Sequence, residues 1–307
     1  MILCCGEALI DMIEGDDAFM PHVGGAVFNT ACALGRLEQK VGFVSGLSTD
    51  MFGTRLQDAL HASHVDTSHM IFSDRPTTLA FVQLSGGNAT YTFYDENTAG
   101  RCLDAANLPT IPDTARALYF GGISLIGMPA ADFYAALAVD QADKRVIMID
   151  PNIRPQFITN PAAYRARLAK MIAVSDILKV SDDDLNWIID GPATLDEKAA
   201  EVLAQGPKLL LLTKGSEGAK AYLASGQTAE AKARKVDVVD TVGAGDTFNA
   251  GVLAKLSQMG CLTKQGIAKL SAEDARAALG LGVEVAAITV SRAGANPPLL
   301  SELSIPI

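Results

Sequence analysis

The sequence DTVGAGD, residues 240–246, joins a β-branched segment to a segment that carries apolar residues at helical spacing. We predict a short strand over residues 236–239 and a helix over residues 247–254. Residues 243–245 have no bulky side chains, so their N–H groups can converge on an anion at the positive end of the helix dipole. A phosphate group is the ligand that such a turn is expected to hold.

Asp246 is expected at the mouth of the predicted helix, beside the amides of Gly243, Ala244 and Gly245. Its negative charge disfavours direct phosphate binding, but a carboxylate in this position suits a general base that takes the proton of an attacking hydroxyl group. The alternative is that Asp246 only caps the helix, a common role of Asp after a glycine-rich turn. The glycine spacing matches neither the Gly-x-Gly-x-x-Gly fingerprint of dinucleotide sites nor the Gly-x4-Gly-Lys-Ser/Thr fingerprint of P-loops, so a dinucleotide oxidoreductase and a Walker-type site are disfavoured.

The composition indicates a soluble globular protein, since 49% of the 307 residues are hydrophobic and 20% are charged. The net charge of -10 argues against nucleic acid as a partner, because proteins that bind the phosphate backbone need clustered Lys and Arg. The amino-terminal residues lack a basic leader, and no apolar run reaches the roughly 18 residues of a membrane span, so we expect a cytoplasmic protein. The five cysteines form no CxxC pair and are interpreted as buried thiols.

Apolar runs bounded by turn residues alternate along the chain with segments of helical spacing. Strands are predicted at 2–10, 40–46, 117–121, 145–150, 177–180 and 208–213, and helices at 29–37, 54–63, 130–138 and 195–204. This alternation is typical of a parallel sheet with helices on both faces, joined by right-handed crossovers. The sequence therefore predicts an α/β fold.

Residues 77–94 interrupt this rhythm. Two alternating segments flank the glycine-rich sequence SGGN at 85–88, which predicts a β-hairpin. The hairpin is either an antiparallel edge of the main sheet or a flap over a ligand pocket, for which the alternation of Tyr91 and Phe93 with threonines argues; the sequence leaves both open. Since we find no internal repeat and no low-complexity linker, we treat residues 1–307 as one domain with a lid.

The sequence around Asp246 resembles the carboxy-terminal signature of the ribokinase-like (PfkB) carbohydrate kinases, Asp-Thr-x-Gly-Ala-Gly-Asp followed by Thr-Phe. Other segments resemble motifs of the same family and occur in its order: GGAVFNTA at 24–31, GLSTDMFG at 46–53, DPNIR at 150–154 and TKGSEG at 213–218. The resemblance covers nearly the whole chain. It implies a ribokinase-like three-layer sandwich with a mostly parallel central sheet and a small β lid formed by about 11–23 and 75–98.

On the sugar side, the resemblance implies that Asp11, Gly24, Gly25 and Asn29 contact the hydroxyl groups of a sugar, with Phe93 reaching the sugar from the lid. Asp11 follows the first strand, at the edge where open α/β sheets bind ligands, and a carboxylate accepts hydrogen bonds from paired hydroxyl groups. From residue type alone, Asp11 could equally be a surface turn residue. Asn29 could equally cap the helix that follows it.

For the nucleotide, the resemblance implies that ATP lies along residues 213–218. The expected contacts are Thr213, Lys214, Gly215 and Gly218, together with Gly245 of the anion loop. Lys179 is expected nearby, and Arg154 is expected to face the transferred phosphoryl group or an acidic substrate, because fixed donors and cations stabilise the charge that develops in phosphoryl transfer. Taken alone, Lys179 could be a solvated lysine at a strand end, and Arg154 could belong to a surface ion pair.

Two departures from the family pattern concern metal ions. The family commonly has Asn-x-x-Glu where this chain has SDDD at 181–184, so Asp184 is expected either to hold Mg²⁺ through a water molecule or to complete a plain capping box. Near the end of the chain, SRAGANPP at 291–298 stands where relatives bind a monovalent cation together with a residue that corresponds to Asp240. Pro297 and Pro298 leave K⁺ dependence open.

The resemblance implies an ATP-dependent phosphotransferase that acts on a hydroxyl group of a monosaccharide. GEALID at 6–11 and YDEN at 94–97 resemble bacterial fructokinases more than ribokinases, which implies fructose as the acceptor. The alternatives are a 2-keto-3-deoxygluconate kinase, for which Arg75 and Arg101 near the lid could supply further cations, a nucleoside kinase, or a catalytically silent sugar or nucleotide sensor. A homodimer could form through the lid, since a lid strand can pair with a second copy or stay single.

Overall fold

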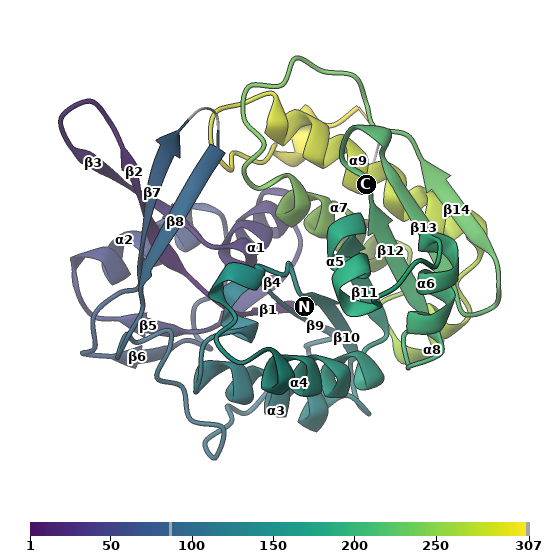
Figure 1. Ribbon diagram of the computed structural model, residues 1–307, viewed down its shortest axis with the longest axis horizontal. Coiled ribbons are helices and arrows are strands. Elements are labelled where there is room, and N and C mark those ends of the chain that lie inside the picture. Colours follow the sequence, from purple (N-terminus) through teal and green to yellow (C-terminus); the bar gives the residue numbers. More distant parts are fainter. Residues whose placement is uncertain (86–87, 305–307) are drawn as a thin grey trace.

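The computed structural model describes residues 1–85 and 88–304, so the turn predicted at 85–88 lies partly outside the described residues. Figure 1 shows a central sheet flanked by helices and a smaller sheet set to one side. The central sheet has eight strands in the order β14-β13-β12-β11-β10-β9-β1-β4. Their bounds are β1 Ile2–Cys5, β4 Val41–Val44, β9 Ala117–Gly121, β10 Val146–Asp150, β11 Ile177–Ser181, β12 Leu209–Thr213, β13 Ala219–Leu223 and β14 Thr228–Ala231. The six strands from β12 to β4 pair in parallel, whereas β13 and β14 add antiparallel pairings.

Helices cover both faces of this sheet because its strands are apolar on both sides. In β10, Val146 and Met148 pack into one core cluster, and the alternate residues Ile147 and Ile149 pack into the other. The first cluster includes side chains of α1 (Ala26–Arg36), α2 (Met51–Ala62), α7 (Ala244–Gln258), α8 (Lys264–Ala268) and α9 (Ala272–Val290). The second includes side chains of α3 (Ala130–Gln141), α4 (Pro161–Val174), α5 (Asp182–Ile188) and α6 (Leu195–Leu203). The predicted α/β class and three-layer arrangement are confirmed.

The small sheet is separate from the central one. It has four strands in the order β3-β2-β7-β8, with bounds β2 Leu9–Glu14, β3 Phe19–Gly24, β7 Leu79–Ser85 and β8 Asn88–Tyr94. The predicted hairpin is therefore confirmed as a pair of strands, and its placement at the edge of the main sheet is wrong. A further two-stranded sheet joins β5 (Gly46–Ser48) to β6 (Ile71–Ser73).

Two strand predictions need correction. The apolar run at 2–10 is not one strand: it splits into β1 and β2, which belong to different sheets, because the chain turns at Gly6. A Cβ atom at Gly6 would lie only 2.4 Å from Cγ2 of Val27, so this passage beside α1 admits no side chain. Residues 236–239 form no strand, since the N–H groups of Val239 and Asp240 donate to the carbonyl oxygen of Val290 at 2.8 and 3.2 Å instead of to a neighbouring strand.

Among residues 1–85 and 88–304, no helix has both the length and the apolar character that crossing a membrane requires.

Candidate functional site

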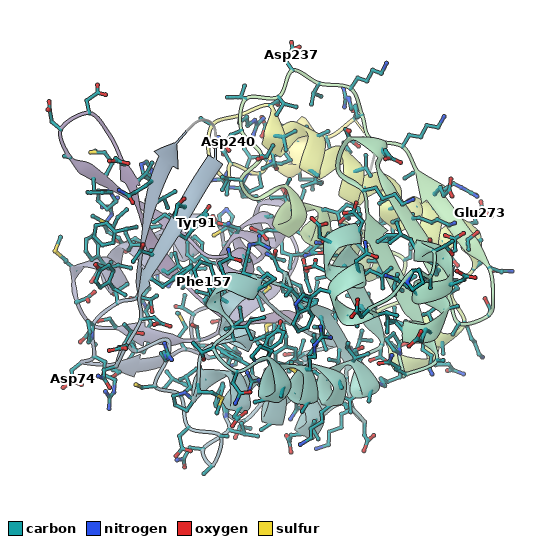
Figure 2. The ribbon with its side chains drawn as sticks, viewed as in Figure 1. Asp74, Tyr91, Phe157, Asp237, Asp240 and Glu273 are labelled. Atoms are coloured by element: carbon teal, nitrogen blue, oxygen red, sulfur yellow. The ribbon has the colours of Figure 1, made fainter. Side chains whose placement is uncertain are left out.

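A cavity of about 350 Å³ opens between the small sheet and the carboxyl ends of the central strands. Open α/β sheets bind their ligands at this edge, because the loops that follow the parallel strands converge there. Its lining comes from both layers, with Asp11, Tyr91 and Phe93 on the small sheet and Phe157, Lys179 and Asp246 on the main body. Tyr91 and Phe157, which Figure 2 labels, mark these two sides.

The turn at 241–245 leads into α7 and forms one wall of the cavity. Gly243 is the N-cap residue of α7 and has a left-handed backbone with φ of 78°. A Cβ atom at this position would lie 2.7 Å from Cβ of Ala295, so both the conformation and the packing require glycine. The first N–H groups of α7 thereby lie at the cavity, where the helix dipole favours an anion.

Asp246 is the third residue of α7 rather than its N-cap, so the interpretation of Asp246 as only a capping residue is wrong. Its side chain is buried and accepts a hydrogen bond from Nδ2 of Asn29 at 2.9 Å. Burial raises the pKa of Asp246 to about 7; the charge of Asp150 adds to this rise, and the Asn29 amide opposes it. A carboxyl group with this pKa can take up a proton near neutral pH.

Lys179 lies beneath the turn, in contact with a buried carboxylate. Its Nζ atom is 2.9 Å from Oδ2 of Asp150, and both side chains are buried, so the reading of Lys179 as a solvated lysine is wrong. Nδ2 of Asn249 donates to the same Oδ2 atom at 2.7 Å and to the hydroxyl oxygen of Tyr119 at 3.0 Å. Burial lowers the pKa of Lys179, and the nearby carboxylates, that of Asp150 first, more than reverse this, so its pKa lies above the ordinary value. The ammonium group is therefore a fixed cation.

Asp11 faces the cavity from β2, close to two glycines at the start of α1. Burial raises the pKa of Asp11 to about 6, with a further contribution from the charge of Glu7. A Cβ atom at Gly24 would lie 2.2 Å from Oδ2 of Asp11, so the carboxylate occupies the space that a side chain there would fill. Gly25 has φ of 114° and forms the N-cap of α1. Gly24 and Asp11 are thus fitted to one another, whereas a Cβ atom at Gly25 would lie 3.0 Å from the carbonyl oxygen of Glu7. The contact of these residues with a sugar stays a prediction.

Glu7, which sequence reasoning did not assign to the site, also lines the cavity. Its carboxylate accepts from the N–H groups of Ala26 at 3.0 Å and Ser124 at 3.2 Å, and burial raises its pKa. Glu7 therefore ties the start of α1 to the segment that follows β9. Glu7 comes just after β1 and shortly before Asp11 in the sequence, and this position at a strand end could have identified it.

An aromatic contact joins the small sheet to the main body. The rings of Phe93 in β8 and Phe157 in the short helix η2 (Pro155–Phe157) meet edge to face, with centroids 4.8 Å apart, and Tyr91 stacks beside Phe93 at 6.2 Å. Phe93 was predicted at the site, whereas Tyr91 was not assigned to it and Phe157 was missed altogether. No local pattern marks Phe157, because only the fold brings η2 opposite β8.

Arg154 also lines the cavity, beside Phe157. Its Nη1 atom donates to the carbonyl oxygen of Ile153 at 3.1 Å, and no ion pair joins it to another residue within 1–85 and 88–304. The surface ion pair that was one reading of Arg154 is therefore not observed, and its guanidinium group remains available to an anion in the cavity.

The predicted nucleotide contacts at 213–218 follow β12, the neighbour of β11, and are not among the described residues that line this cavity. Gly218 has φ of 109°, and a Cβ atom there would lie 2.2 Å from the carbonyl oxygen of Ala231, which explains the glycine by backbone geometry. The roles of Thr213, Lys214, Gly215 and Gly218 toward a nucleotide stay predictions.

Asp184 forms the capping box that was one of its two interpretations. Oδ2 accepts from N and Oγ of Ser181 at 3.0 and 2.7 Å, and Oδ1 accepts from the N–H group of Ile153 at 2.8 Å. Both oxygens thus have protein donors, and a role in holding Mg²⁺ stays a prediction. Across residues 1–85 and 88–304, no group of three or more His, Cys, Asp or Glu side chains is arranged to hold a metal ion.

Asp240 connects the turn before α7 to the segment near the chain end. Oδ1 accepts from the N–H group of Val242 at 3.0 Å, and Oδ2 accepts from that of Gly294 at 2.9 Å. Figure 2 labels Asp240 on this loop, close to the upper end of β8 in that view. Its part in binding a monovalent cation stays a prediction.

Comparison with known proteins gives one consistent family. The model of the pfkB family carbohydrate kinases matches residues 1–302. A fructokinase of Rhizobium leguminosarum bv. trifolii is 49% identical over 282 residues, and the comparison covers 90% of this chain and 86% of the relative. The crystal structure of a fructokinase with bound ATP from Xylella fastidiosa has a TM-score of 0.87 at 29% identity and covers 98% of this chain and 96% of that one.

A more distant structure shares the fold. A fructokinase double mutant of Vibrio cholerae O395, in a form that binds fructose, ADP and potassium ion, has a TM-score of 0.83 at 23% identity, with 96% of this chain and 93% of that one covered.

Proposed function

The chain belongs to the pfkB family of carbohydrate kinases, and on this premise we propose that it is a fructokinase, which transfers the γ-phosphoryl group of ATP to a hydroxyl group of fructose. The observation that carries the proposal is the buried carboxyl group of Asp246, whose pKa is raised to about 7, at the amino-terminal end of α7 and inside a cavity that also holds Asp11. Phosphoryl transfer to a hydroxyl group requires a base and, in the same cavity, N–H groups that can hold an anion, as the turn at 241–245 offers.

In the proposed reaction, fructose and ATP, as its Mg²⁺ complex, are the substrates. Asp246 takes the proton of the acceptor hydroxyl, whose oxygen forms a bond to the γ-phosphorus as the bond from that phosphorus to the β,γ-bridging oxygen breaks. ADP leaves with the electron pair of the broken bond, and Asp246 returns its proton to solvent. The amides of Gly243, Ala244 and Gly245, with Lys179 and Arg154, stabilise the negative charge on the transferred group.

The sugar is assigned to the side of the cavity formed by the small sheet. Asp11 accepts hydrogen bonds from sugar hydroxyl groups, and Gly24 and Gly25 let the backbone approach closely. Phe93 covers the sugar and places the small sheet in the role of a lid, which excludes water and so limits hydrolysis of ATP. Asn29 connects the sugar site with the proposed base, because its amide donates a hydrogen bond to Asp246.

A neutral acceptor is favoured over an acid sugar. Arg101, one of the cations considered for 2-keto-3-deoxygluconate, pairs with Asp95 at 2.5 Å, and Arg75 donates to the carbonyl oxygen of Asn97. Neither lines the cavity, so Lys179 and Arg154 are the described cations there. Both are assigned to the phosphoryl group, which leaves no described cation for a sugar carboxylate.

The nucleotide is assigned to the carboxyl ends of β11 and β12, with residues 213–218 along its phosphates and ribose. The monovalent cation that the family resemblance implies is assigned to the region of Asp240 and residues 291–296, because carboxylate and carbonyl oxygens suit K⁺, which is bound in a double mutant of the Vibrio cholerae fructokinase. K⁺ bound there would stabilise the turn before α7. Replacing K⁺ by Na⁺ in the assay is expected to lower kcat; equal rates in both salts would remove this assignment.

We further propose that the chain forms a homodimer through the outer face of the small sheet. By the alternation of strands, Phe19, Phe81 and Tyr94 lie on the face away from Asp11, and their rings are in edge contact at 5.0 and 5.3 Å. Phe19 and Tyr94 are exposed. An apolar aromatic face on a small two-sided sheet is suited to pairing with its own copy.

The test is an assay of ADP release with fructose, ribose, 2-keto-3-deoxygluconate, inosine and adenosine as acceptors, on the wild type and on Asp246→Asn. Fructose should give the highest kcat/KM, and Asp246→Asn should lower kcat by roughly 10²–10⁴-fold. If no acceptor stimulates ADP release, the protein is a sensor rather than a kinase. If fructose is accepted but Asp246→Asn keeps most of the activity, only the base is wrongly assigned.

A further inference from the structure

Four buried polar side chains form a connected group next to the turn at 241–245, called the anion turn below. Lys179 contacts Asp150, Asn249 donates to Asp150, and Asn249 also donates to Tyr119. Their elements are far apart in the chain: Asp150 ends β10, Lys179 lies in β11, Tyr119 lies in β9 and Asn249 lies in α7. The fold therefore gathers one ion pair and its hydrogen-bond partners at the carboxyl edge of the central sheet.

Stability alone does not explain this group. Replacing a buried ion pair by apolar side chains is often neutral or stabilising by about 1–4 kcal/mol, because removing both charges from water is costly. Oδ1 of Asp150 and Oδ1 of Asn249 are both buried without a hydrogen-bond partner among the described residues. Unpartnered buried oxygens reduce stability further and are rare in native proteins. A functional reason for keeping the charges is therefore indicated.

The position of the ammonium group supplies that reason. A Cβ atom at Gly245 would lie 3.3 Å from Nζ of Lys179, so the ammonium group lies next to the second residue of α7. Lys179 also lines the cavity. The N–H groups at the start of α7 and this ammonium group thus face the same anion position from two directions.

The same group is connected rigidly to the base. Asn249 lies three residues after Asp246 on α7, one turn along the same helix face. The charge of Asp150 raises the pKa of Asp246, and that of Lys179 lowers it. A change in either charged partner is therefore expected to alter the ionisation of the base.

We propose that Asp150 is a positioning residue: held by Asn249, it fixes Lys179 in its charged form beneath Gly245, where the ammonium group binds the oxygens of the γ-phosphoryl group. This inference rests on the proposed function, since it assigns the partner of the transferred phosphoryl group. It makes Asp150 act through Lys179, without contact with substrate.

The central experiment is a double-mutant cycle of Asp150→Asn and Lys179→Gln. Each single variant should lower kcat by roughly a hundredfold, as expected for loss of one fixed donor to the developing charge, with the KM for fructose changed less than about threefold. The double variant should be no slower than the slower single variant, because both changes remove the same cation. Effects that multiply, or a wild-type kcat in Asp150→Asn, would overturn the proposal.

The pH profile separates this role from a structural one. Because Lys179 lowers the pKa of Asp246, Lys179→Gln should move the acidic limb of kcat/KM to higher pH. A side chain that only supports the fold would leave that limb in place. Asn249→Ala, which keeps both charges but frees the Asp150 carboxylate, should lower kcat by about tenfold and provides a second variant if Asp150→Asn does not fold.

Asp176 offers a matched control. It is also buried and pairs with Lys264 at 2.8 Å, but it precedes β11 and accepts from the N–H group of Ile147 near the start of β10, at the opposite edge of the sheet. Asp176→Asn should lower the thermal midpoint and leave kcat within about twofold of wild type. An equal loss of kcat in both Asp→Asn variants would show a general effect of core charges and overturn the proposal.

A binding measurement keeps the inference distinct from the choice of sugar. Calorimetric titration with the β,γ-imido analogue of ATP should show about tenfold weaker binding by Asp150→Asn and by Lys179→Gln, while binding of ADP changes less than about twofold. This result is expected even if the wild type does not phosphorylate fructose, in which case the proposed acceptor fails and the positioning role stands. Unchanged binding of the analogue would refute the role of Asp150.

Discussion

The position of the Asp246 side chain gives it the raised pKa that the proposed base requires. Its carboxyl group is buried at the positive end of α7. The loss of water around it affects its pKa most, followed by the hydrogen bond from Asn29 and the charges of Asp150 and Lys179. Burial is the larger effect, so the pKa is raised to about 7 instead of lowered by the helix dipole. A carboxylate that ionises near neutral pH is a stronger base than an exposed one and still charged enough to act.

This charge state predicts the pH dependence of the reaction. The base acts only when ionised, so kcat/KM for fructose should fall about tenfold per pH unit below pH 7, where Asp246 takes up its proton. Below about pH 6 the slope should steepen, because Asp11 then protonates as well. Asp11→Asn should raise the KM for fructose and remove the second slope. A flat profile between pH 5.5 and 7.5 in the wild type would contradict the assignment of Asp246.

A steric test of the sugar site is Gly24→Ala. The new methyl group would lie 2.2 Å from Oδ2 of Asp11 and must displace that carboxylate, so we expect the KM for fructose to rise about tenfold, the loss of one good hydrogen bond to a charged group. The KM for ATP should change little. Gly280→Ala is the control, since a Cβ atom there meets nothing within 4 Å. Equal KM values for fructose in all three proteins would separate Asp11 from the sugar.

Among the elements, β8 and η2 matter most for access to the site. The edge-to-face contact of Phe93 and Phe157 joins the small sheet to the main body across the cavity. An aromatic pair of this kind contributes about 0.5–1.5 kcal/mol beyond the area that it buries. The contact is therefore strong enough to bias the small sheet toward the body and weak enough to open for substrate.

Phe157→Ala should loosen that closure. We expect a two- to tenfold rise in the KM for fructose, in line with the energy of one aromatic pair, and more hydrolysis of ATP in the absence of sugar, because water then enters the cavity more readily. Both are measured by ADP release with and without fructose. Phe72→Ala removes an exposed ring from β6 as a control. If the two variants behave alike, Phe157 has no part in closing the lid.

At the scale of the whole molecule, the two faces of the small sheet differ. The inner face carries Asp11, Tyr91 and Phe93 to the cavity, and the outer face carries Phe19, Phe81 and Tyr94. The main body has its own core on each side of the central sheet and does not need the outer aromatic face for its packing. This division supports the homodimer proposed above.

Tyr94→Asp tests that homodimer. The substitution places a charge on the outer face, at a side chain that is 61% exposed, and should convert a dimer into a monomer in sedimentation equilibrium. Phe72→Asp places the same charge on an exposed side chain outside the small sheet and should leave the mass unchanged. A wild-type protein that sediments as a monomer at micromolar concentration would end the proposal of a dimer.

Much of the fold follows from local sequence, because the periodicity of apolar residues and the backbone preferences of glycine act over short stretches of chain. The alternation of apolar runs with helical segments marks β9 to β12 within a residue or two, and the glycines of 243–245 identify the anion turn, since few other residues permit that backbone. Propensity failed at 236–239, where β-branched residues indicated a strand. The N–H groups of Val239 and Asp240 donate to Val290 at the end of α9 and not to a strand.

The sequence by itself determined the family, the anion turn and the identity of the candidate base. Only the tertiary structure decided what surrounds that base. Asn29 reaches Asp246 across 217 positions, and Asn249 reaches Asp150 across 99. The raised pKa of Asp246, the charge of Lys179 and the contact of Phe93 with Phe157 all depend on such pairs. Burial and electrostatic interaction depend on distances in space. Spacing along the chain does not give those distances, because they are set only when the sheet brings the carboxyl ends of its strands together.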